Sequence, residues 1–156
     1  MVRFDAASSA ESIKQVRKLF LEYAKSLDFK LCFQDFDKEL ASLPGEYAPP
    51  SGRLFIAIEK SKPVGCVGLR PLQDGACEMK RLYVKPDHRR EGIGRAMAQL
   101  VISEANAIGF SKMRLDTVSS MIPAITLYKS LGFREISPYR FNPIEGAVYL
   151  ELDLAH

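Results

Sequence analysis

The sequence predicts a mixed α/β domain, in which antiparallel hairpins come first and strand–helix–strand crossovers follow. Short apolar runs bounded by turn residues, typical of strands, dominate residues 54–84. Apolar residues at spacings of three and four then return between later runs, as in crossover helices. Because 156 residues are enough to bury a core without disulfides, we expect a single domain over residues 1–156.

The composition excludes several classes of function. With 47% hydrophobic and 26% charged residues, the chain resembles an ordinary globular protein. No apolar run approaches the roughly 20 residues of a membrane span, and the first residues lack the pattern of a signal peptide. We therefore expect a cytoplasmic protein without a membrane partner. A net charge of +3 favours an anionic ligand but does not predict nucleic-acid binding.

Cysteines and histidines give no sign of a metal site. Cys32, Cys66 and Cys77 form no CxxC pair, and we expect them to be reduced core residues. His88 and His156 are too few and too far apart in the sequence to predict a metal cluster.

Two helices are predicted in the first third of the chain. Ser8 and Glu11 form the pattern of a capping box, which marks a helix start. One apolar stripe follows at helical spacing, made of Ile13, Val16, Phe20, Tyr23 and Leu27. A second, shorter helix is expected from about Asp35 to Leu43, and residues 47–52 read as a loop.

The strands are predicted from apolar runs and from the turns between them. Residues 54–58 and 64–69 form an expected hairpin with its turn at 60–63. One helix is expected after the charged loop that follows residue 84, and it ends at a left-handed cap at Gly109. Another is expected from Pro123 to Gly132. The remaining strands are expected over residues 77–84, 113–118, 133–136 and 147–154.

The loop after the strand 77–84 carries the strongest functional signal. Gly92 and Gly94 open the next helix, and their lack of a Cβ atom allows a ligand to approach the backbone. The free amides and the dipole of a helix start attract an anion, and Arg89, Arg90 and Arg95 add positive charge. We expect a pyrophosphate to bind here. The alternative is an ordinary turn with solvated arginines.

Two other nucleotide-binding motifs do not fit this loop. A P-loop ends in Gly-Lys-Ser/Thr, whereas Gly94 is followed by Arg95 and Ala96. A dinucleotide-binding fingerprint requires a third glycine at the position of Met97.

At these residues the sequence resembles the GNAT superfamily of acyltransferases. The superfamily signature Arg/Gln-x-x-Gly-x-Gly/Ala is matched by Arg89, Gly92 and Gly94. A strand of the form Leu-Tyr-Val-x-Pro precedes it, at residues 82–86. Residues 124–133 match the later segment Ala-x-x-Leu-Tyr-x-x-x-Gly-Phe.

The resemblance covers roughly residues 54 to 154 and implies the GNAT fold. That fold is a mixed central sheet, flanked by helices, whose fourth and fifth strands splay apart. It also implies acetyl-CoA as acyl donor and co-substrate, without a metal. The splay leaves a cleft for the pantetheine arm, where backbone groups of Leu82 and Val84 form hydrogen bonds.

Twelve residues are expected to bind acetyl-CoA on the basis of this resemblance. They are Leu82, Tyr83, Val84, Arg89, Arg90, Glu91, Gly92, Ile93, Gly94, Arg95, Ala96 and Ser119. Many family members carry an asparagine after the fifth strand, where this chain has Ser119 and Ser120. Which serine replaces that asparagine is left open.

The resemblance implies that Tyr128 is the general acid that protonates the departing thiolate. Its alternative role is that of a core tyrosine on a helix face beside Leu127 and Leu131.

Glu78, on the predicted fourth strand, is the candidate base. An amine acceptor with a pKa near 10 arrives protonated, and a carboxylate could remove that proton directly or through water. Pairing with Lys80 or Arg81, or simple solvation, is the alternative. Since Cys66 and Cys77 have no histidine within the motifs, we expect direct transfer without an acyl-enzyme.

Further residues are candidates for binding the acceptor. Arg70, Arg81 or Arg140 could hold a substrate carboxylate, with surface solvation as the alternative. Tyr47 and the loop 139–143 are candidates for the wall of the acceptor site.

The sequence therefore predicts an N-acetyltransferase that moves an acetyl group from acetyl-CoA to a small-molecule or amino-acid-like amine. One alternative is acetylation of a protein N-terminus or lysine. Another is a catalytically silent CoA-binding sensor. The oligomeric state stays open, with a homodimer among the alternatives.

Overall fold

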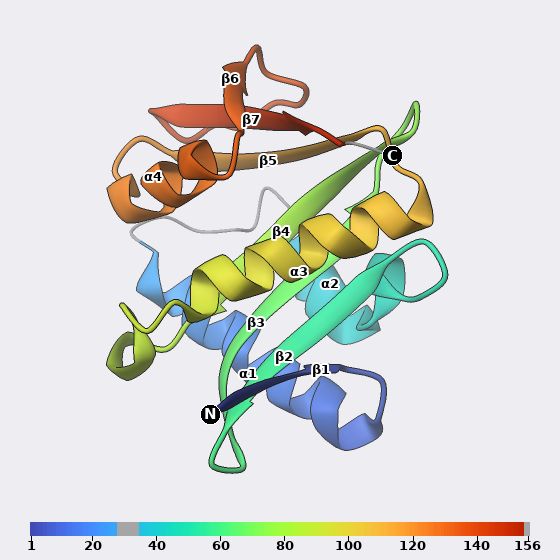
Figure 1. The fold of residues 1–156 in the computed structure, drawn as a ribbon, viewed down its shortest axis with the longest axis vertical. Coiled ribbons are helices and arrows are strands. Elements are labelled where there is room, and N and C mark those ends of the chain that lie inside the picture. Colours follow the sequence, from blue (N-terminus) through green and yellow to red (C-terminus); the bar gives the residue numbers. More distant parts are fainter. Residues whose placement is uncertain (28–34, 155–156) are drawn as a thin grey trace.

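A seven-stranded mixed sheet runs through the computed structural model, which describes residues 1–27 and 35–154 (Figure 1). The strand order is β1-β2-β3-β4-β5-β7-β6. In chain order the strands are β1 (Val2–Ala6), β2 (Arg53–Glu59), β3 (Lys62–Pro71), β4 (Ala76–Val84), β5 (Lys112–Val118), β6 (Arg134–Ile136) and β7 (Ala147–Asp153). All neighbours are antiparallel except β4 and β5, which are parallel. The predicted mixed sheet is confirmed.

Helices cover both faces of this sheet (Figure 1). They are α1 (Ala10–Ser26), α2 (Phe36–Ser42), α3 (Ile93–Ile108) and α4 (Ile122–Ser130). Residues of α1 and α2 pack with one face of the sheet in one buried apolar cluster. Residues of α3 and α4 pack with the other face in a second, larger cluster. Within the described ranges, no helix combines the length and the apolar character needed to cross a membrane.

The start of α1 differs from the prediction. Ser9, not Ser8, is the N-cap residue, and its hydroxyl accepts a hydrogen bond from the backbone N–H of Ser12 at 3.1 Å. The Ser12 hydroxyl in turn accepts from the backbone N–H of Ser9 at 3.0 Å. The predicted pair of Ser8 and Glu11 was wrong because the helix begins one residue later, where a serine replaces the usual Glu or Gln.

The predicted hairpin of β2 and β3 is confirmed, with a tighter turn than expected. Only Lys60 and Ser61 separate the strands, and their φ angles are +51° and +66°. Two consecutive left-handed residues make a two-residue turn whose twist matches that of the strands.

The predicted cap of α3 is confirmed. Gly109 caps the C-terminal end of this helix with a φ of +108°.

The described cysteines, Cys66 and Cys77, are buried and unpaired, in agreement with their prediction as reduced core residues. Cys32 and His156 lie outside the described residues.

The parallel pair β4 and β5 separates along its length. Pairing joins Ala76, Cys77 and Glu78 to residues 112–114 and goes no further, although β4 continues to Val84. On its other side, β4 has a bulge against β3, because the register shifts between Cys66 and Gly68. The strand splay implied by the family resemblance is therefore present, and it positions the site described next.

Candidate active site

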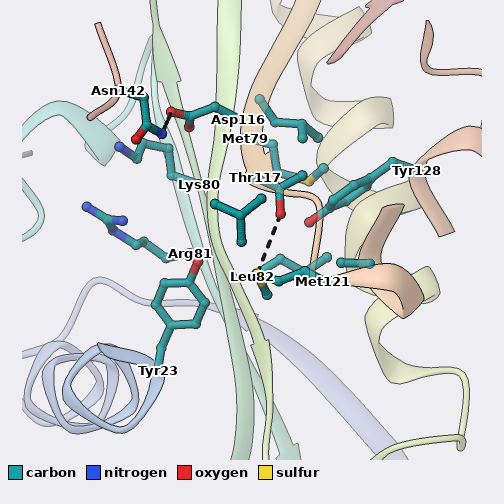
Figure 2. Close-up of a pocket in the computed structure, with 13 residues that line it drawn as sticks. Tyr23, Met79, Lys80, Arg81, Leu82, Asp116, Thr117, Met121, Tyr128 and Asn142 are labelled. Atoms are coloured by element: carbon teal, nitrogen blue, oxygen red, sulfur yellow. Dashed lines mark hydrogen bonds between the residues drawn. The ribbon is translucent and has the colours of Figure 1, made fainter. Parts of the chain in front are cut away.

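A cavity of about 90 Å³ occupies the split between β4 and β5 (Figure 2). Its lining comes from both strands, from α1 and α4, and from the loop between β6 and β7, and consists of Tyr23, Met79, Lys80, Arg81, Leu82, Leu115, Asp116, Thr117, Val118, Met121, Ala124, Tyr128 and Asn142. Figure 2 shows Tyr128 and Met121 on one side of the strands and Lys80 and Arg81 on the other. The cavity therefore links the two faces of the sheet.

The loop between β4 and α3 presents an open backbone. Gly92 is the N-cap of α3 at φ +81°, and a Cβ atom added there would meet nothing within 4 Å. At Gly94, an added Cβ would lie 3.8 Å from the Val84 side chain and 3.9 Å from the Leu127 side chain. A ligand can thus reach the first amides of α3, where the helix dipole favours an anion.

The three arginines of this loop differ in their surroundings. The Arg89 Nε donates to the Val84 carbonyl at 3.0 Å and the guanidinium lies over the Tyr83 ring, so it fastens the loop to β4. Arg95 donates to the Ser130 hydroxyl at 2.7 Å and ties α3 to α4. Arg90 is exposed and forms no hydrogen bond or ion pair with the other described residues. It is the arginine best placed to meet a bound anion.

Other predicted cofactor-binding residues support the loop from beneath or beside it. Ile93 is 3% exposed and packs in the core, and Tyr83 packs edge-on against Tyr23. The Glu91 carboxylate lies 3.6 Å from His88 Nδ1. Ala96 is half-buried, one residue before the fully buried Met97.

The predicted serine contact does not lie at the cavity. The backbone N–H of Ser119 donates to the Gly146 carbonyl at 2.8 Å, and Ser119 and Ser120 are both exposed. Thr117 and Met121 line the cavity in their place, with the Thr117 hydroxyl 3.5 Å from the Met121 sulfur (Figure 2).

Tyr128 projects from α4 into the cavity, with 8% of its surface exposed (Figure 2). Its ring packs against Phe133 with 5.8 Å between centroids. Burial raises the pKa of its hydroxyl, so the group keeps its proton. No other described residue forms a hydrogen bond with that hydroxyl, which leaves its proton available to a group inside the cavity.

Glu78 is fully buried, and its carboxylate is enclosed by cations. One oxygen accepts from the Nε and Nη2 of Arg70 at 2.9 and 2.8 Å. The other accepts from the Tyr139 hydroxyl at 2.6 Å and from Arg140. Burial alone would raise the pKa of Glu78, but Lys80, Arg140 and Arg70 hold it below its ordinary value. The carboxylate is therefore ionised and engaged on both oxygens.

Arg81 is buried too, so its predicted alternative as a solvated surface residue was wrong. Its side chain is 2% exposed and forms two hydrogen bonds to Glu39, at 3.1 and 2.9 Å. The Tyr47 hydroxyl donates to the same carboxylate at 2.9 Å. This cluster joins α2 to the bulge of β4, and Tyr47 does not line the cavity.

The loop between β6 and β7, which contains the residues 139–143 predicted as a wall of the acceptor site, contributes Asn142 to the cavity lining. Asn142 donates to the Asp116 carboxylate at 3.3 Å. The Tyr149 hydroxyl donates to the Arg140 carbonyl at 2.9 Å and helps to hold the loop.

Sequence reasoning missed four cavity residues with polar groups: Tyr23, Lys80, Asp116 and Thr117. Strand alternation could place Asp116 and Thr117 on β5 but could not show which strand edge is open. Lys80 and Arg81 would be expected on opposite faces, whereas the bulge turns both to one face.

The comparisons with known proteins agree with this geometry. Residues 13–133 match the family model described as the acetyltransferase (GNAT) family. An uncharacterized N-acetyltransferase of Schizosaccharomyces pombe is 36% identical over 99% of this chain and 96% of its own length.

Solved structures show the same fold. An acetyltransferase of the GNAT family from Staphylococcus aureus has a TM-score of 0.83 at 20% identity, covering 99% of this chain and 100% of its own. The ribosomal-protein-S18-alanine N-acetyltransferase of Escherichia coli has a TM-score of 0.74 at 19% identity, covering 100% of this chain and 96% of its own.

Proposed function

The chain belongs to the GNAT acetyltransferase family, and from this premise we propose that it transfers an acetyl group from acetyl-CoA to the amine of a small-molecule or amino-acid-like acceptor. The observation that carries the proposal is the cavity between β4 and β5. Tyr128 and Met121 line it on the side of the strands where the catalytic step is proposed, and its part on the other side, lined by Tyr23, Lys80, Arg81 and Asn142, is the proposed acceptor chamber (Figure 2). We further propose that residues 1–156 act as one domain in the cytoplasm.

The loop between β4 and α3 fits the phosphates of the co-substrate. The open backbone at Gly92, the exposed Arg90 and the start of α3 suit a pyrophosphate. The unpaired edge of β4, from Met79 to Val84, suits an extended arm that forms backbone hydrogen bonds. Acetyl-CoA, when bound, supplies the acetyl thioester. Ser119 or Ser120 remains a candidate contact for the same arm.

The chain's own groups then account for the remaining steps. Backbone N–H groups near Leu82 are suited to stabilise negative charge on a carbonyl oxygen in the split. Tyr128 holds a proton at its hydroxyl and can give it to a departing thiolate, which is its proposed role as general acid. Attack by the acceptor amine is proposed to be direct. Burial raises the pKa of the Cys77 thiol to about 12, and that of Cys66 also rises, so neither offers a ready thiolate.

The acceptor amine has to lose a proton as it is acetylated. Glu78 remains the base predicted from the sequence, acting directly or through water. For that role, one of its present partners, Arg140 or Tyr139, has to give way. The enclosed carboxylate supports a second role, in which Glu78 holds the wall of the acceptor chamber.

A screen for thiol release tests the proposal. Purified protein is incubated with acetyl-CoA and a panel of amines, amino acids, lysine peptides and peptides with free N-termini. Release with small amines or amino acids supports the proposal. Release with peptides alone would favour a protein acceptor, which is what the structural neighbour from Escherichia coli has by its name. Binding of acetyl-CoA without any release would indicate a silent sensor.

A further inference from the structure

Three side chains that can ligate a metal meet at the end of β2, beside the loop between β4 and α3. Glu59 is the last residue of β2, and His88 ends the short 3-10 helix of residues 86–88. Glu91 directly precedes Gly92, the N-cap of α3. One ligand atom from each of the three lies within 4.8 Å of the other two. The sequence did not predict this cluster, because Glu59 lies far along the chain from its two partners.

Two atoms of the cluster are shielded from solvent and have no hydrogen-bond partner. They are Glu59 Oε2 and His88 Nδ1, and neither forms a hydrogen bond with another described residue. They face each other at 3.4 Å, which exceeds the roughly 2.7–3.2 Å of an ordinary N–H···O bond. Because nearly all buried polar atoms in folded proteins have a partner, such a pair calls for an explanation, and a bound ion is one.

The described part of the protein supplies no lysine or arginine to balance the charge of the cluster. Within residues 1–27 and 35–154, the ion pairs of Glu59 and Glu91 are formed with His88 alone. A protonated His88 would add one positive charge, but its Nδ1 forms no hydrogen bond to either carboxylate. A divalent cation among the three side chains would balance both carboxylates and give each shielded atom a partner.

The spacing and the type of the ligand atoms fit zinc. His88 Nδ1 lies 3.4 Å from Glu59 Oε2 and 3.6 Å from Glu91 Oε1. Zinc binds histidine nitrogen and carboxylate oxygen at about 2.0–2.2 Å, so two ligand atoms of a tetrahedral site lie roughly 3.4 Å apart. The imidazole nitrogen disfavours Mg²⁺ and Ca²⁺, which take oxygen ligands.

We propose that Glu59, His88 and Glu91 bind one Zn²⁺ ion, with water in the fourth position. The ion would fasten the loop between β4 and α3 to the end of β2. Its role would be structural, because none of the three residues lines the cavity between β4 and β5. The inference goes beyond the proposed function and does not depend on it, since zinc binding is measured without acetyl-CoA.

The first test measures zinc binding by metal-free protein from which any affinity tag has been removed. We expect isothermal titration calorimetry to show one zinc ion per chain. The melting temperature should rise with zinc concentration, because the ion binds the folded state. Mg²⁺ at the same concentration should leave it unchanged. An absence of zinc binding would overturn the inference and leave His88 as an ion-pair partner of the two carboxylates. An equal response to Mg²⁺ would overturn it as well.

Variants of the ligands then assign the ion to this cluster. His88→Gln and Glu59→Gln should each weaken zinc binding on the order of 100-fold, since each removes a ligand. Glu91→Gln should do the same, and it changes a side chain that is 46% exposed, so it is the variant least able to disturb folding. His156→Gln changes the other histidine of the chain and should bind zinc as the wild type does. Unchanged binding by His88→Gln, or a loss in His156→Gln, would contradict the proposal.

Hydrogen exchange locates the ion without any substitution. Zinc should slow the exchange of backbone amides in residues 85–92 and at the end of β2, because it ties these two segments together. Mass spectrometry of peptides from the protein with and without zinc measures this difference. Protection centred on another segment, such as those around Cys66 and Cys77, would place the ion elsewhere and overturn the inference.

Discussion

The Tyr139 hydroxyl donates a hydrogen bond of 2.6 Å to Glu78, and so joins the last loop of the chain to the centre of the sheet. Arg140 binds the same carboxylate oxygen and Arg70 binds the other. This loop also carries Asn142 into the cavity wall. A buried carboxylate on β4 therefore determines where one wall of the candidate acceptor chamber lies.

We expect Glu78→Gln to destabilise the protein at neutral pH by on the order of 3 kcal/mol, because it leaves two partly buried arginines, Arg70 and Arg140, without their carboxylate. The pKa of Glu78 lies below its ordinary value of 4.5, so the carboxylate stabilises the fold above that pH. Its contribution is lost as the pH falls through the lowered pKa. The difference in unfolding free energy between wild type and variant should therefore narrow below about pH 4.5. Urea denaturation across pH measures this, with the exposed Glu135→Gln as a control.

The activity of Glu78→Gln separates two roles. A lost base would reduce kcat/KM chiefly below the acceptor's pKa, where the amine needs to be deprotonated. A displaced chamber wall would reduce it by a similar factor at every pH. We expect the second pattern, because both oxygens of Glu78 are engaged by Arg70, Tyr139 and Arg140. Near-normal rates at high pH would support the base role instead.

The pair of Arg81 and Glu39 provides a prediction about stability. Glu39→Ala leaves an almost fully buried guanidinium without a partner, and we expect a loss of roughly 3–5 kcal/mol. Asp37→Ala, at an exposed position of the same helix, should change little. The double variant Glu39→Leu with Arg81→Met removes both charges and should recover much of the loss. If the double variant is no more stable than Glu39→Ala, the pair is not the cause.

The open backbone between β4 and α3 was predictable from the sequence because its geometry is local. Glycines at the start of a helix leave its first amides accessible, and this arrangement suits the proposed pyrophosphate site. The splay of β4 and β5 came from the family resemblance, not from the residues themselves. The six strands assigned from the sequence were confirmed to within two residues at each end, because apolar runs and turn residues lie next to each other in the chain. The first strand, β1, was not assigned.

The cavity between β4 and β5 was not predictable in the same way. Its walls combine β4, β5, α1 and a late loop, so its residues meet only in three dimensions. The left-handed conformation of Arg81 reverses the alternation of β4, and nothing in a run of Lys80-Arg81 signals it. From the sequence, Lys80 and Arg81 were the expected partners of Glu78. Its ion pairs are instead formed with Arg70 and Arg140.

Binding of acetyl-CoA should raise the melting temperature of the protein. At a concentration about 100-fold above its Kd, a ligand stabilises the folded state by roughly 2.7 kcal/mol. Gly92→Val and Gly94→Val should abolish this rise, because each places a side chain where the ligand approaches the backbone.

Gly109→Val is the matched control for Gly92→Val. Both glycines have a positive φ and open space at the position of a Cβ atom, but Gly109 lies at the other end of α3. Both variants should lose stability through backbone strain, and only Gly109→Val should keep the ligand-induced rise. Normal binding by Gly92→Val and Gly94→Val would put the pyrophosphate elsewhere.

The hydroxyl of Tyr128 lies in the cavity without a hydrogen-bond partner among the described residues, while its ring packs against Phe133. Tyr128→Phe should therefore leave the melting temperature and the affinity for acetyl-CoA nearly unchanged. If the hydroxyl protonates the departing thiolate, kcat should fall on the order of 10²-fold or more. Steady-state kinetics and thermal unfolding on the same preparation measure both quantities.

Tyr47→Phe supplies the opposite pattern as a control. The Tyr47 hydroxyl donates to Glu39 at 2.9 Å and lies outside the cavity, so its loss should cost about 1 kcal/mol of stability and spare kcat. If Tyr128→Phe behaves like Tyr47→Phe, with a lower melting temperature and unchanged turnover, Tyr128 is a packing residue. The thiolate would then have to take its proton from water or from another group in the split, and the Thr117 hydroxyl, which shares the cavity with Tyr128, would be the next to substitute.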